Sequence, residues 1–231
     1  MILLISDLHK SLDNMKEINS VKWLLNVLDE LKPDYLIGAG DWGEAMTADD
    51  FSEILTRTRL ITVYGNHENF TIIKNLSIRD GQVVRVGELR VSGINGLIGY
   101  DEDYGIPPGR FMRIVNKIKG VDILVTHQPP YIPELYPNMR DNEQAILTTQ
   151  ALEQIRPRLH FSGHMTGGCY SYYEFKWGKY LRVDTSARFR CYALTDGRDV
   201  TVYQKGEEVF RFSLIGSPLW ILIPLFFPDP S

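Results

Sequence analysis

The residues best suited to chemistry lie in five short polar segments, each of which follows an apolar run. These segments are Asp7-Leu8-His9, Gly40-Asp41-Trp42-Gly43-Glu44, Gly65-Asn66-His67-Glu68, Thr126-His127-Gln128-Pro129-Pro130 and Gly163-His164-Met165-Thr166. The chain has 5 histidines, and only His160 lies elsewhere, inside an apolar run where we expect a core position. Imidazole, carboxylate and amide oxygen are ligands of divalent metal ions. The concentration of these residue types therefore predicts a metal site.

The composition of these segments also indicates which kind of metal site to expect. They contain no cysteine, which argues against a structural zinc cluster. The Asp7-x-His9 spacing predicts two ligands on one face of a strand, because alternate residues point the same way. A carboxylate that bridges two ions would form a two-metal centre. Such a centre polarises phosphoryl oxygens and lowers the pKa of a bridging water, so that a bridging hydroxide attacks a phosphate ester.

Strands and helices that could position these segments follow from the apolar patterns. Apolar runs predict strands over 2–6, 35–38 and 60–64, and helical spacing predicts helices over 13–31 and 49–58 between them. Strands that alternate with helices are typical of a parallel sheet. Because the carboxyl ends of its strands meet at one edge, the polar segments can share one cavity. Asn66 could also be an ordinary helix N-cap.

The later part of the chain adds further strands and then loses its helices. We expect a hairpin over 82–93, a long loop over 96–109, strands over 121–125 and 159–162, and helices over 111–118 and 142–156. From residue 170 to 212, short strands separated by turns predict an antiparallel meander. One domain over 1–213 with two packed sheets is the simplest arrangement.

Composition excludes some classes of protein. The chain has 231 residues, a net charge of −4, 44% hydrophobic and 23% charged residues, which are ordinary values for a globular protein. No block of Lys and Arg stands out, so bulk charge does not support nucleic-acid binding.

Cys169 and Cys191 are not in a CxxC arrangement, and no secretory leader precedes them. We therefore expect reduced thiols and a cytoplasmic protein.

The C-terminal tail over 214–231 is apolar but interrupted by Pro218 and Pro224. Its apolar part is shorter than the stretch of about twenty residues that spans a bilayer. Three interpretations stay open: packing on the domain, a homo-oligomer interface, and peripheral contact with a membrane.

Taken in order, the five polar segments resemble the signature of the calcineurin-like metallophosphoesterase superfamily, over roughly residues 1–205. The resemblance implies an α/β (α+β) fold, a four-layer αββα sandwich of two mixed β-sheets flanked by helices. It also implies a binuclear site at the carboxyl ends of the strands, occupied by two divalent ions. Manganese, iron and zinc all suit these ligands.

The resemblance assigns Asp7 and His9 to the first metal ion and makes Asp41 the carboxylate that bridges both ions. The family usually reads Gly-His-x-His, and its last histidine binds the first ion. Thr166 stands at that position here. A hydroxyl is a poor replacement for an imidazole, so occupancy of the first site is in question, and a mononuclear or inactive site is an open alternative.

The second metal ion is assigned to Asn66, His127 and His164. His67 corresponds to the catalytic histidine, which contacts the phosphate and protonates the leaving oxygen. Glu68 could orient His67, or it could be an acid favoured at the start of a helix by the helix dipole.

The predicted function is that of a hydrolase, a metal-dependent phosphatase or phosphodiesterase acting on a phosphomonoester or phosphodiester. A manganese-dependent nuclease with the same site is one alternative. A second alternative is a binding scaffold that keeps the fold and has lost hydrolysis, and that is similar in this respect to the retromer subunit of this family. Thr166 and the apolar tail favour the scaffold, whereas His67 and the other ligand positions oppose it.

Overall fold

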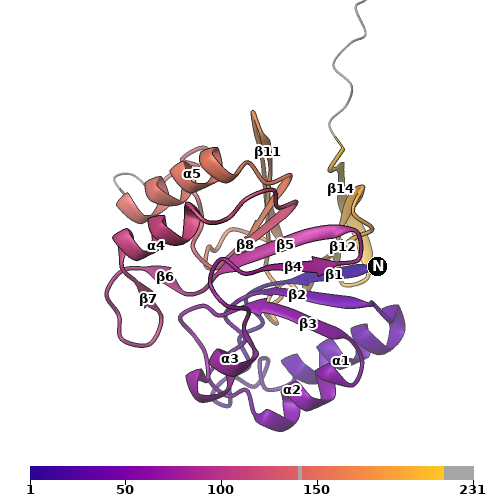
Figure 1. Cartoon of the computed structure of the whole chain (residues 1–231). Helices are drawn as coiled ribbons and strands as arrows, with labels where there is room; N and C mark the ends of the chain where they lie inside the picture. Colours follow the sequence, from indigo (N-terminus) through magenta and orange to yellow (C-terminus); the bar gives the residue numbers. More distant parts are fainter. Residues whose placement is uncertain (140–141, 216–231) are drawn as a thin grey trace, which may run out of the picture.

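Two mixed six-stranded sheets pack face to face, with helices on both outer sides, in a computed structural model that describes residues 1–139 and 142–215 (Figure 1). This is the four-layer arrangement that the resemblance implied. The first sheet contains, in spatial order, β14 (Glu207–Ser213), β13 (Asp199–Gln204), β12 (Cys191–Thr195), β1 (Ile2–Ile5), β2 (Tyr35–Ala39) and β3 (Arg59–Val63). The parallel strands β1, β2 and β3 end at the same edge.

The second sheet carries the other half of the polar segments. It contains, in spatial order, β10 (Tyr170–Phe175), β11 (Gly178–Val183), β9 (Leu159–Ser162), β8 (Ile123–Thr126), β5 (Leu89–Ile94) and β4 (Val83–Val86). Strands β4 and β5 form the predicted hairpin. The segment over 96–109, expected to be a loop, contains the short parallel pair β6 (Leu97–Ile98) and β7 (Gly105–Ile106).

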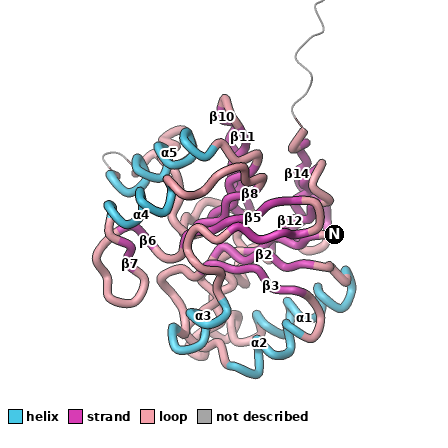
Figure 2. Tube along the Cα trace, in the orientation of Figure 1, coloured by secondary structure: helices cyan, strands magenta, loops and turns pink. Residues whose placement is uncertain are grey.

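Five helices cover the two outer faces in the described part of the chain (Figure 2). The first sheet is covered by α1 (Ser20–Leu31), α2 (Ala48–Leu55) and α3 (Phe70–Leu76). The second sheet is covered by α4 (Pro108–Val115) and α5 (Glu143–Ile155). Each sheet is therefore buried on both faces around the strands that carry the polar segments.

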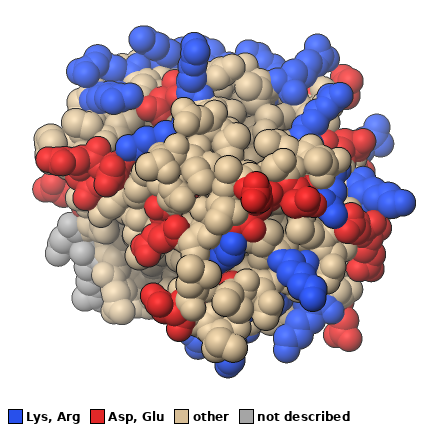
Figure 3. Space-filling model, turned by 90° about the horizontal axis from the view of Figure 1, so that it is seen from below, with Lys and Arg blue, Asp and Glu red and all other residues tan. Residues whose placement is uncertain are grey.

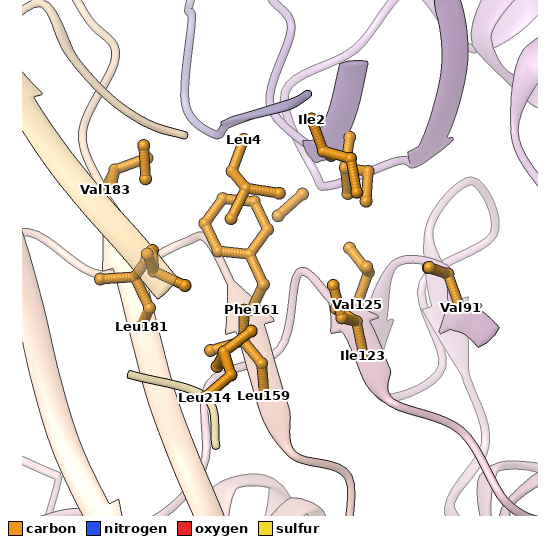
Figure 4. Packing of buried hydrophobic residues seen from close by; sticks show 14 of the residues in the cluster. Ile2, Leu4, Val91, Ile123, Val125, Leu159, Phe161, Leu181, Val183 and Leu214 are labelled. Carbon is orange, nitrogen blue, oxygen red and sulfur yellow. The ribbon is translucent and has the colours of Figure 1, made fainter. Parts of the chain in front are cut away.

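Strand β1 shows how the sequence produces this layering. Ile2 and Leu4 join the apolar cluster between the sheets, whereas Leu3 and Ile5 join the cluster beneath α1 and α2. Figure 4 shows Leu4 beside Phe161 of the opposite sheet. Because successive side chains of a strand point to opposite faces, one continuous apolar run supplies side chains to the core on both sides of the sheet.

The predicted helix over 13–31 is too long at its start. Helix α1 begins at Ser20, and residues 15–19 form turns, with Met15 80% exposed. Tertiary contacts hold this segment: Glu17 Oε1 accepts the N–H of Ala187 at 2.9 Å, and Lys16 O accepts from Arg190 at 3.2 Å. The helical spacing upstream of Ser20 is therefore overridden by contacts with residues far along the chain.

The predicted meander is divided between the sheets. Strands β10 and β11 are antiparallel to each other, but β11 pairs in parallel with β9 and so extends the second sheet. Strands β12, β13 and β14 extend the first sheet. The turns lie where the sequence predicts them, but turn residues do not show which sheet receives each strand.

The prediction of reduced thiols is wrong, because Cys169 and Cys191 form a disulfide. Cys169 directly precedes β10 and Cys191 begins β12, so the bond joins the two sheets. The backbone of Asp184 lies between them: its N–H donates to Cys169 O at 2.8 Å, and its carbonyl accepts from Cys191 at 3.0 Å. The Cα atoms are 5.5 Å apart, and this proximity depends on sheet packing rather than on sequence spacing. The expectation of a cytoplasmic location loses this support.

The tail prediction lies almost wholly outside the described residues, which include Leu214 and Ile215 and exclude 216–231. The boundary after residue 213, homo-oligomer formation and membrane contact therefore stay predictions. Within the described residues, no helix has the length and apolar character needed to cross a membrane.

Candidate metal centre

All five polar segments meet at one end of the sandwich. Asp7, Asp41 and Asn66 follow β1, β2 and β3 of the first sheet, whereas His127 and His164 follow β8 and β9 of the second. The expectation that one parallel sheet supplies all of them is wrong. They converge because β8 packs across the interface against β2 and β3, which brings two sets of strand ends together.

The carboxylate of Asp41 lies at the middle of the group. Its Oδ1 is 3.2 Å from His127 Nε2, and its Oδ2 is 3.6 Å from His9 Nε2. The same nitrogen of His9 is 3.8 Å from Asp7 Oδ1. Each oxygen of Asp41 thus faces a different set of candidate ligands.

A second set of contacts surrounds the Asn66 side chain. Its Oδ1 is 3.2 Å from His127 Nε2 and 3.0 Å from His164 Nδ1. His127 Nδ1 is 2.8 Å from the carbonyl of Ala39, so it donates to that oxygen and its Nε2 faces Asp41 and Asn66. A backbone acceptor that orients the imidazole in this way is common for metal-binding histidines.

These residues fit a divalent cation. Asp7, Asp41 and His127 are buried and offer ligand atoms that all lie within 4.8 Å of one another. Within the described residues, neither carboxylate forms an ion pair with Lys or Arg, and their only cationic partners are histidines. Asp7 and Asp41 are thus buried carboxylates with ligand atoms within 4.8 Å of each other, and a cation between them would offset the cost of burying their charges.

Burial and mutual charge shift the pKa values of the three groups. Burial raises the pKa of Asp7 to about 6, and the nearby carboxylate of Asp41 adds to this effect. Burial also disfavours ionised Asp41, but the charge and hydrogen bond of His127 lower its pKa well below the ordinary value. In turn, Asp41 overcomes the desolvation of His127 and raises the pKa of that imidazole to about 9.

The backbone at the ligand positions adopts an uncommon conformation. Asp7, His9, Asp41 and His164 have positive φ angles of 57°, 53°, 56° and 70°. The prediction that Asp7 and His9 project from one strand face is therefore wrong: they follow β1 in the left-handed region. Non-glycine residues in this region cluster at functional sites, where the surrounding structure offsets their cost.

Glycines allow the segments to approach so closely. A Cβ atom on Gly65 would collide with Asp41 Oδ1 and would lie 2.7 Å from His127 Nε2. A Cβ on Gly163 would lie 2.7 Å from His127 Nδ1. Any larger residue at these positions would displace the candidate ligands.

A sequence profile described as the calcineurin-like phosphoesterase superfamily domain matches residues 1–165. The chain belongs to this superfamily. The matched region contains four of the five polar segments and the fifth as far as Met165. None of the curated proteins compared with the chain matches it.

Solved structures with the same fold include proteins of different kinds. A dimetal phosphatase from Danio rerio is 10% identical, with a TM-score of 0.57, over 94% of this chain and 98% of that one. GAP50, the anchor in the inner membrane complex of Plasmodium, is 13% identical, with a TM-score of 0.57, over 92% and 87%. A single mutant of Vps29 from Entamoeba histolytica is 12% identical, with a TM-score of 0.50, over 92% and 98%. At such identities the likeness shows the fold alone, and it is equal for the phosphatase and the anchor.

The acidic partner of His67 in this phosphoesterase domain is Glu44 and not Glu68. His67 Nδ1 lies 3.1 Å from Glu44 Oε1. Glu68 is buried and accepts backbone N–H groups of Asp41, Trp42 and Gly65 at 2.8, 3.1 and 2.8 Å. Burial raises the pKa of Glu68 to about 8. Of the two roles left open for Glu68, orienting His67 is wrong, because its carboxylate ties the turn after β2 to the turn after β3.

Thr166 and His160 are the two remaining positions that the sequence analysis singled out. Thr166 is exposed in the loop that follows His164. His160 is fully buried, as predicted, with Nε2 2.8 Å from Thr126 Oγ1. Burial lowers the pKa of His160 to about 3, so it is neutral and structural.

Proposed function

We propose that this protein hydrolyses phosphomonoesters or phosphodiesters with the help of two divalent metal ions. The observation that carries this proposal is the position of Asp41, whose two carboxylate oxygens face two separate sets of ligands. A single cation would not require a carboxylate directed to both sides. Membership of the phosphoesterase superfamily supports the same chemistry.

The residues would divide between the two ions as the family resemblance implies. Asp7 and His9 would hold the first ion, and Asn66, His127 and His164 would hold the second. When bound, the ions would polarise the phosphoryl oxygens and lower the pKa of a water that acts as the nucleophile.

His67 has the properties of the general acid. Its side chain is 53% exposed, and its ring centroid is 5.6 Å from that of His9, so it borders the centre without being enclosed by it. The contact between Nδ1 and Glu44 leaves Nε2 to donate a proton to the leaving oxygen. The contact with the carboxylate of Glu44 would fix the orientation of the His67 ring.

A catalytically inactive scaffold is the second candidate. Thr166 replaces an imidazole that the family usually supplies to the first ion, and an anchor protein shares the fold as closely as a dimetal phosphatase does. Nucleic acid has less support. In Figure 3, Lys and Arg (blue) gather along the upper rim of this face, whereas Asp and Glu (red) lie at both sides and near its middle, so the face as a whole is not basic.

Metal content and turnover decide between these candidates. The chelator-treated chain is reloaded with Mn²⁺, Fe²⁺ or Zn²⁺ and assayed on 4-nitrophenyl phosphate, its bis-ester and single-stranded DNA. We expect about two ions per chain and turnover of an aryl ester. His67→Gln should lower kcat by about 10²–10⁴-fold with metal content unchanged. Asn75→Gln, an exposed position on α3, is the matched control. No bound metal and no turnover would favour the scaffold.

A further inference from the structure

The disulfide between Cys169 and Cys191 lies at the end of the sandwich that carries the candidate metal centre. Cys169 closes the short segment that begins at His164, and it directly precedes β10. Cys191 begins β12, which runs antiparallel to β1, so it lies beside the end of β1 that leads into Asp7. The bond therefore joins two elements that lead to candidate ligands.

Hydrogen bonds continue from Cys191 to Asp7 through two buried hydroxyl groups. Thr185 Oγ1 donates to Cys191 O at 2.7 Å and accepts the N–H of Ser6 at 3.3 Å. The backbone of Thr185 adds a second link, because its N–H donates to Ser6 O at 3.0 Å. Ser6 Oγ in turn donates to Asp7 Oδ2 at 2.7 Å. Since Thr185 and Ser6 are both buried, this series of polar contacts connects the cysteine to a candidate ligand of the first ion within the protein interior.

The disulfide also fixes the position of Thr185, because it closes a covalent loop that contains this residue. The two cysteines are 22 positions apart, and β10, β11 and Thr185 lie between them. Asp184 is the residue before Thr185, and its backbone bridges the two ends of the loop. Its N–H donates to Cys169 O at 2.8 Å, and its carbonyl accepts the N–H of Cys191 at 3.0 Å. The separation of the two cysteines therefore sets where Thr185 meets Ser6.

The two cysteines differ in how an external reagent can approach them. Cys169 is partly exposed, whereas Cys191 is 0% exposed. A thiolate from another molecule therefore meets Cys169 first, since thiol exchange requires access to the sulfur that is attacked. The chain has 2 cysteines, so it supplies no third thiol for this reaction, and the reductant must come from outside the chain.

We propose that the bond between Cys169 and Cys191 is a site of thiol exchange, and that its reduction by a small dithiol weakens metal binding by Asp7. One thiolate of the dithiol forms a bond to Cys169 Sγ, while the bond between the two cysteines breaks and Cys191 leaves with the electron pair. The second thiolate then attacks the reagent sulfur of this mixed disulfide, and Cys169 leaves in the same way. Both cysteines take up the protons that the dithiol has lost, and the dithiol is oxidised by two electrons to a cyclic disulfide. The inference rests on the metal centre of the function proposed above.

Reduction and metal binding are linked through Asp7. Loss of a partner that orients a metal ligand typically costs about 10–100-fold in affinity. Because reduction loosens the contacts of Thr185 and Ser6 without removing them, we expect the affinity for the first ion to fall by about tenfold and that for the second ion to stay unchanged. Linkage is reciprocal, so metal that saturates the centre should make the disulfide about tenfold harder to reduce. For a two-electron couple this change corresponds to about 30 mV.

Both sides of this linkage can be measured without turnover. The full chain, freed of metal by a chelator, is titrated with Mn²⁺ by calorimetry, and the double variant Cys169→Ser/Cys191→Ser is titrated in the same way. The variant represents the reduced state and has no thiol that could itself bind metal. In a second measurement, the wild-type disulfide is equilibrated with oxidised and reduced dithiothreitol, with and without Mn²⁺, and alkylated thiols are counted by mass spectrometry. Equal Mn²⁺ affinities of the two chains, or an equilibrium that Mn²⁺ does not shift, would overturn the proposal.

A monothiol shows which sulfur is attacked. Brief treatment with glutathione, followed by alkylation, should leave the glutathione adduct on Cys169 and the alkyl group on Cys191. The reverse distribution would contradict the assignment of Cys169 as the accessible sulfur.

Variants of Thr185 test the route through which the disulfide acts. Thr185→Val removes the hydroxyl that joins Cys191 to Ser6, and Thr185→Ser, the matched control, keeps it. In the Thr185→Val background, loss of both cysteines should change the affinity for the first ion by about twofold or less, whereas the effect of about tenfold should persist with Thr185→Ser. An effect of about tenfold in a Thr185→Val chain that still unfolds cooperatively would contradict this route. The Mn²⁺ titrations described above do not depend on these variants.

The two proposals fail in different ways. A protein whose Mn²⁺ affinity depends on the disulfide but which hydrolyses no ester would refute the proposed hydrolase and support the thiol-exchange site. A protein that hydrolyses esters and binds Mn²⁺ equally with and without the disulfide would do the opposite. A protein that binds no Mn²⁺ in either form would refute both.

Discussion

The two sets of candidate ligands around Asp41 differ in how completely the fold builds them. On the side of His127, polar atoms lie 3.0–3.2 Å apart, and the His127 side chain is 0% exposed. On the side of His9, the corresponding distances are 3.6–3.8 Å, and the His9 side chain is 37% exposed. By the family resemblance, Thr166 also stands at the position of a further imidazole on the first side. The fold thus orders one set of candidate ligands more than the other, and under the proposed function the two metal affinities should differ accordingly.

Asp41 is the element common to both sites, so its loss should have the largest effect. Asp41→Asn keeps an oxygen for the N–H groups of Asn66 and His67 but removes the charge that faces both sets of ligands. We expect both ions to be lost and turnover to fall by about a thousandfold. Elemental analysis and ester hydrolysis measure this result. Retention of two ions would show that Asp41 does not bridge them.

Removing one histidine from each side tests the asymmetry directly. His127→Ala should abolish tight metal binding, with an affinity loss of at least about 100-fold, because the fold preorganises this ligand. His9→Ala should leave about one tightly bound ion per chain and remove the weaker one. Metal titration of both variants by calorimetry gives the stoichiometries. Equal losses in the two variants would mean that the two sides are equivalent.

Restoring an imidazole at the open side should reduce the difference. Thr166→His is expected to tighten the weaker site by about tenfold and to bring the stoichiometry closer to two at low metal concentration. Thr166→Ser should leave the metal affinity unchanged, and its metal titration provides the baseline.

The smallest expected effect concerns His160, which lies on β9, the strand that precedes His164. His160 has a pKa lowered by burial from 6.5 to about 3, so the unfolded chain binds a proton more readily than the folded one. The free energy of unfolding therefore has its full contribution from neutral His160 above about pH 6.5. This contribution is lost as the pH falls toward 3, by up to ~1.4 kcal/mol per pH unit. His160→Gln keeps a donor for Thr126 and does not titrate. Urea unfolding of the metal-free proteins between pH 7.5 and 5 should show a shallower pH dependence for the variant. Parallel curves would contradict this assignment.

Local patterns predicted most of the elements and the residue types of the site. The apolar runs before Asp7, Asp41 and His127 form strands, and the polar motifs at their ends can be read from the sequence whatever the strand pairing is. The prediction failed where distant contacts decide the outcome. The start of α1 depends on Ala187 and Arg190, and the acidic partner of His67 depends on how the turns after β2 and β3 approach each other.

Sequence by itself determined which residues could bind metal, the order of the strands that carry them and the glycines that leave room for them, because turn chemistry and hydrophobic period are local properties. Tertiary structure alone decided that two sheets supply one site, that Asp41 faces two sets of ligands, and that Cys169 bonds to Cys191. The N–H of His164, for example, donates to Asp7 Oδ1 across 157 positions of the chain. Such a contact has no signature in either local segment, because it exists only once the apolar faces of both sheets are packed together.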